Sequence, residues 1–104
     1  PGTVCLFKDF TVTIEDVFRF DAEDVLVFRV RFENAGNSAV HYDPRNMAVR
    51  AGHTVYPVAL ADATGVVPPQ SNTEAIFAIA GTPEGGRANL SVKNVFSVLV
   101  PRTT

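Results

Sequence analysis

Both histidines of the chain lie in one short stretch, HYDPRNMAVRAGHTVY (residues 41–56), together with an aspartate. On a β-strand His41 and Asp43 would share one face, because side chains alternate between the two faces. A hairpin after them would bring His53 back toward the pair. A His/Asp/His set can hold a divalent metal ion, so a metal- or ligand-binding site around these residues is one hypothesis. We favour the other, the polar side of an ordinary hairpin, since Asp before Pro is common in turns.

Two other candidate sites, a phosphate-binding loop and a serine nucleophile, lack the sequence around them that each requires. GTPEGGRA (81–88) has the glycine spacing of a phosphate-binding loop, but Arg87 and Ala88 replace the Lys and Ser/Thr. That loop also needs a helix after it, whereas ANLSVKNVFSV reads as a strand. The serines lack the G-x-S-x-G context of a nucleophile elbow. We therefore expect neither an enzyme nor a cofactor.

Apolar residues at every second position predict the strands that would carry these residues. In FTVTI (10–14) and VLVFRVRFE (25–33), the alternation is that of antiparallel strands with one exposed face. Asp16 falls in phase with the apolar face, which predicts a bulge or bend there. If the Phe-bearing faces of the two strands coincide, Glu15 lies opposite Arg29.

Turn residues divide the rest of the chain into short segments. We expect a strand at 40–43, a hairpin around Gly52, an irregular stretch at 60–73, a strand at 74–80, a loop at 81–89 and a strand at 95–100. Residues 33–40 are expected to form a loop, in which Asn34, Gly36 and Asn37 tolerate a positive φ. Seven or eight strands in one domain, residues 1–104, predict an all-β antiparallel sandwich.

Composition narrows the range of partners. The formal net charge of −2 provides no basic surface for nucleic acid, and no apolar run approaches the length of a membrane span. The single cysteine, Cys5, excludes an intrachain disulfide, and between Val4 and Leu6 it is expected to be buried. The opening PGTVCLF lacks the features of a signal peptide, so we expect an excised domain or a mature form.

The surface of such a sandwich is then the place for binding. Val25 and Val27 beside Arg29 and Arg31 make a strand face that is half apolar, either a partner surface or an outer face covered by Arg stems. The 34–45 region and the loops at 60–73 and 81–89 are further candidates. Edge strands can pair with another protein or with a second copy.

The stretch VLVFRVRFENAGNSAVHYDPRNMAVRAGHTVYPV, followed by VVPPQSNT and EAIFAIA, resembles the immunoglobulin-like domains of bacterial secreted proteins and lipoproteins. This is the group related to a mycobacterial secreted antigen. The resemblance implies an immunoglobulin-like fold, an extracellular or cell-envelope location and a binding or structural role without catalysis. A spacer domain in a longer adhesin-like chain is the remaining alternative.

Overall fold

Antiparallel β-strands account for most of the described residues in a computed structural model, which describes residues 3–81, 86–87 and 90–103. The strands are β1 (Thr3–Phe7), β2 (Phe10–Phe20), β3 (Val25–Asn34), β4 (Val40–His41), β5 (Ala48–Ala51), β6 (Thr54–Pro57), β7 (Leu60–Asp62), β8 (Val66–Val67), β9 (Ser71–Ala80) and β10 (Phe96–Leu99). A short 3₁₀ helix, η1 (Pro44–Asn46), precedes β5. These described residues contain no α-helix, so the prediction of an all-β chain is confirmed.

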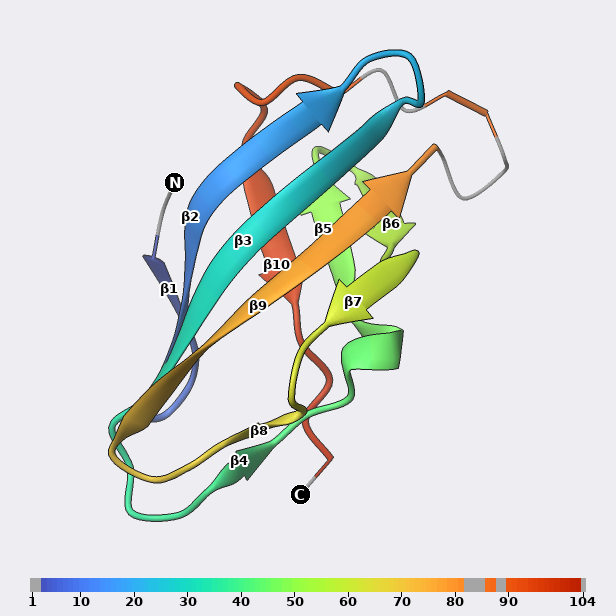
Figure 1. Cartoon of the computed structure of the whole chain (residues 1–104). Coiled ribbons are helices and arrows are strands. Elements are labelled where there is room, and N and C mark those ends of the chain that lie inside the picture. The colour runs from blue at the N-terminus through green and yellow to red at the C-terminus, as the bar shows by residue number, and fades with distance from the viewer. Residues whose placement is uncertain (1–2, 82–85, 88–89, 104) are drawn as a thin grey trace.

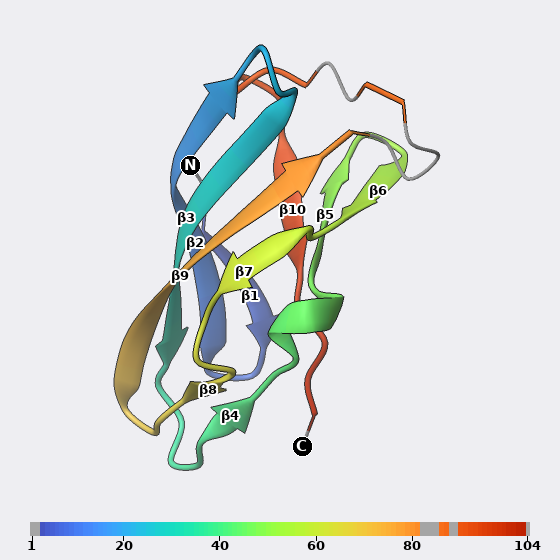
Figure 2. The same cartoon turned by 45° about the vertical axis from the view of Figure 1, so that its right-hand side comes forward.

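The sheets form two layers (Figures 1 and 2). The front layer in Figure 1 is five-stranded, in the order β1-β2-β3-β9-β7, and the back layer is three-stranded, in the order β10-β5-β6. A separate pair, β4 and β8, lies at one end of the molecule. Every pairing of these strands is antiparallel, and the arrangement is consistent with a β-sandwich.

The core lies between the two layers and is built from the alternating residues identified in the sequence. Leu26, Phe28, Val30 and Phe32 of β3 are fully buried. Phe28 stacks on Phe77 of β9 at a ring-centroid distance of 5.2 Å. Each buried Phe contributes roughly 1.5–3 kcal/mol relative to an exposed one. Phe28 also meets Phe96 of β10 edge to face at 5.0 Å, so the packed rings join the two layers.

A bulge between Ile14 and Asp16 interrupts the pairing of β2 with β3, as the out-of-phase aspartate predicted. The expected partner of Arg29 was wrong, because the bulge places Asp16 rather than Glu15 opposite it. Before the bulge the even-numbered residues of β2 point toward the core, and after it the odd-numbered residues do. Val17 therefore pairs with buried Phe28, and Phe18 points to the outer face.

Three further expectations need correction. Cys5 is exposed rather than buried, because β1 lies at the edge of its sheet, and its thiol donates to the Phe7 carbonyl at 3.0 Å. The stretch 60–73 contains β7, β8 and the start of β9 rather than an irregular loop. Among residues 90–95 the described backbone is turn and coil, so the final strand begins only at Phe96.

The other expectations meet the structure as follows. The described residues form ten strands, whereas we expected seven or eight in the whole chain. Gly52 has a φ of 63° in the β5–β6 turn, as predicted, whereas none of Asn34, Gly36 and Asn37 has a positive φ. The loop expected at 81–89 lies largely outside the described residues.

Candidate protein-binding surface

The structure does not assemble His41, Asp43 and His53 into one site. His41 is exposed on β4, and His53 is exposed in the turn between β5 and β6. The Asp43 carboxylate caps η1, accepting from the Arg45 backbone N–H at 3.0 Å and from Asn46 Nδ2 at 2.5 Å. Over the described parts of the chain, no group of three or more His, Cys, Asp or Glu residues is placed to hold a metal ion.

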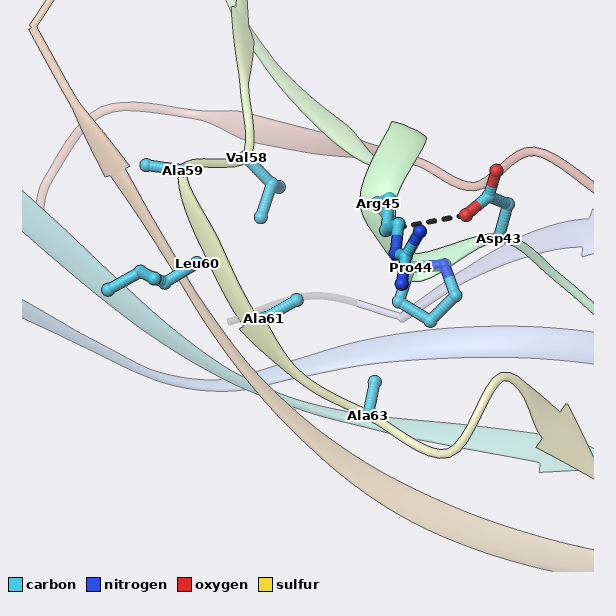
Figure 3. A pocket seen from close by; sticks show the side chains of 8 residues that line it. All are labelled: Asp43, Pro44, Arg45, Val58, Ala59, Leu60, Ala61 and Ala63. Atoms are coloured by element: carbon cyan, nitrogen blue, oxygen red, sulfur yellow. Dashed lines mark hydrogen bonds between the residues drawn. The ribbon is translucent and has the colours of Figure 1, made fainter.

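A hollow of about 400 Å³ lies beside η1, between this helix and the strand β7 (Figure 3). Its walls come from two segments: Asp43, Pro44 and Arg45 on one side, and Val58, Ala59, Leu60, Ala61 and Ala63 on the other. Aliphatic side chains predominate, and the one carboxylate is already used by the helix cap. The mostly aliphatic walls of this hollow offer apolar contact to another molecule.

A continuous row of exposed and partly exposed apolar residues lies on the outer side of the five-stranded sheet. Reversal of the alternation after the bulge turns Phe18 and Phe20 away from the core, and each is 51% exposed. The register then aligns Phe18 with Val27, Val27 with Ala78 and Ala78 with Leu60, which makes one apolar row across four strands. Leu60, at the end of this row, is 75% exposed.

Neighbouring rows extend this apolar area. The next row toward the β2–β3 turn aligns Phe20, Val25 and Ala80, and Ile76 of β9 is 46% exposed on the other side. We call the whole set the apolar face: Phe18, Phe20, Val25, Val27, Leu60, Ile76, Ala78 and Ala80. An apolar area that spans four strands is typical of a protein–protein contact, whereas single exposed apolar residues are ordinary.

A band of ion pairs borders the apolar face along the same strands. Arg29 donates through Nε to Asp16 at 2.7 Å and pairs through Nη1 with Glu74 at 3.0 Å. The hydrogen bond to Asp16 raises the pKa of Arg29 above its ordinary value. Arg31 pairs with Glu33 at 3.0 Å in the next row. Such half-exposed pairs add little stability, but they give the apolar face the polar rim that protein interfaces commonly have.

The sequence alone pointed to two of the eight residues of this surface. Val25 and Val27 were recognised from their alternation with the arginines, and the structure places both on the apolar face. Phe18 and Phe20 were missed, although the out-of-phase Asp16 was a signal that the following residues change sides. Leu60 was missed because its strand was expected to be irregular.

Comparisons with protein-family models, with curated proteins and with solved structures find no match to this chain. Within the described residues, no helix has the length and apolar character needed to cross a membrane. The surface itself is therefore the basis for any statement about function.

Proposed function

We propose that the chain is a non-enzymatic, immunoglobulin-like protein-binding domain of a bacterial secreted or cell-envelope protein, and that the apolar face is its contact surface. The observation that carries the binding role is the row Phe18–Val27–Ala78–Leu60, exposed across four strands. Aromatic side chains supply much of the energy at protein contacts. The two phenylalanines are accordingly the expected anchors.

Two other observations support the remaining parts of the proposal. The two facing antiparallel sheets suit an immunoglobulin-like domain. The secreted or envelope location rests on the resemblance carried by residues 25–58 and the segments after them. Fractionation of the source cells tests it, and recovery of the protein only from the cytosol would contradict it.

Paired surface variants test the binding role. Phe18→Asp removes an anchor and places a charge within the apolar face, whereas Val55→Asp makes the same change on the exposed edge strand β6. The tagged protein is used to isolate partners from cell and medium fractions, and each candidate is purified and its Kd measured. For a true partner, we expect Phe18→Asp to raise the Kd at least about tenfold and Val55→Asp to leave the Kd unchanged.

The same experiment can contradict the proposal. If the purified partner binds Phe18→Asp and the unmodified protein equally well, the apolar face is not the contact surface. If only the Val55→Asp variant loses binding, the contact lies on the three-stranded sheet instead. Circular dichroism confirms that each variant is folded before its affinity is compared.

A further inference from the structure

β10 is an edge strand of the three-stranded sheet, in the layer opposite the one that carries the apolar face. β10 pairs with β5 along one edge, and along the other no described strand pairs with it. Because backbone groups alternate in direction along a strand, alternate N–H and C=O groups of β10 point away from β5. These groups form a template for one more strand.

The five-stranded layer extends past this edge. Phe28 of β3 meets Phe96 of β10 edge to face at 5.0 Å, so β10 lies beneath β3. Both views place β2 and β1 beyond β10 on the same side (Figures 1 and 2). The inner side of β2 there has no described strand of the back layer beneath it.

Incompletely covered core residues gather at this position. A hollow of about 800 Å³ separates β2 from β10, and its apolar walls include Val17 and Phe96. A second hollow, about 450 Å³, lies between β1 and the end of β10, with Leu6, Phe7 and Val100 in its walls. All five of these residues are hydrophobic, only partly buried and packed against the core. They are the surface that an added strand would cover.

We propose that this edge accepts one extended peptide segment of another protein, which pairs with β10 and places apolar side chains at every second position into the hollow against β2. Unpaired backbone groups select an extended chain rather than a helix. A second folded copy would bring its own β1 and β2 against these strands before its β10 could arrive. Glu15 and Asp16 line the hollow together with Lys93, but the two carboxylates already pair with Arg31 and Arg29. The unpaired backbone and the apolar walls therefore define the segment more than its charge does.

The probe is a synthetic nine-residue peptide, Lys-Thr-Val-Thr-Val-Thr-Val-Thr-Lys, labelled for fluorescence anisotropy. Two matched peptides carry N-methyl groups, one on the Val amides and one on the Thr amides. A strand uses the amides of only one edge to pair with its neighbour. We therefore expect saturable binding, a loss of about tenfold or more for one N-methylated peptide, and little change for the other. Backbone amide NMR shifts should concentrate at 96–99 and 14–17.

Three results would overturn the inference: no saturable binding of the unmodified peptide, equal affinities of both N-methylated peptides, or shifts confined to β6 and β7. Concentration-dependent dimerisation with shifts at β10 would also contradict it, because the occupant would then be a second copy. Val17→Asp should abolish peptide binding, while Val55→Asp should not. Phe18→Asp should leave peptide binding intact, which separates this edge from the proposed function of the apolar face.

Discussion

Asn34 shows how a single buried amide can hold a loop against the sheet. Its Nδ2 donates to the carbonyls of Ser38 at 2.8 Å and Val67 at 3.1 Å, while its Oδ1 accepts from the Gly36 N–H at 2.9 Å. The sequence suggested a turn residue at this position. The structure instead makes Asn34 the last residue of β3 and the link between that strand and β8.

Replacing Asn34 by Ala should lower the free energy of unfolding by about 1–3 kcal/mol, because the buried carbonyl of Val67 loses a donor. Urea denaturation measures this difference. Asn37→Ala, at an exposed position of the same loop, is the control and should stay within about 0.5 kcal/mol. If both substitutions changed the free energy of unfolding equally, the hydrogen bonds of the Asn34 amide would not contribute to stability.

Tyr42 predicts an alkaline pH dependence. Burial raises its pKa above the ordinary value of 10.0, an effect that the Gly65 backbone and the Thr64 side chain partly oppose. The unfolded chain therefore loses this proton at a lower pH than the folded chain. The resulting stabilisation is complete below about pH 10 and decreases as the pH rises through the folded-state pKa. As the pH rises through this range, the Tm of Tyr42→Phe should fall less steeply than the Tm of the unmodified protein. Equal slopes of Tm against pH would contradict this role of Tyr42.

Metal addition tests the histidine hypothesis directly. Since His41, Asp43 and His53 do not form a cluster, excess Zn²⁺ should leave the Tm of the protein unchanged. His41→Ala should likewise have the same Tm with and without the ion. A rise in Tm with zinc that His41→Ala abolishes would restore the metal site.

At the scale of elements, the turns depend on backbone conformation as well as sequence pattern. Gly52 has a φ of 63° and nothing within 4 Å of an added Cβ, so Gly52→Ala should cost only the conformational strain, about 1–2 kcal/mol. Gly65 has a φ of 78°, and an added Cβ would lie 3.3 Å from the Tyr42 carbonyl oxygen. Gly65→Ala should therefore be the more destabilising change. Chemical denaturation of the two variants measures the order, and the reverse order would contradict this account.

At the scale of the whole molecule, two phenylalanines on opposite sides of one sheet should behave differently. Phe28 is fully buried between the layers, whereas Phe18 is 51% exposed on the apolar face. Phe28→Ala should destabilise the fold by about 3–5 kcal/mol, since it leaves a cavity among packed rings. Phe18→Ala should change stability by less than about 1 kcal/mol. Comparable losses in calorimetry would mean that the outer face is part of the core.

The sequence by itself determined the all-β class, the inward side of β3, the need for a bulge near Asp16 and the turn at Gly52. These features depend on neighbours along the chain, since alternation and turn conformation are local properties. Only the tertiary structure decided that Phe18 and Phe20 face outward, that Leu60 joins them from a distant segment and that β10 has an open edge. Those outcomes depend on register and layer order, which are set by pairing between residues far apart in sequence.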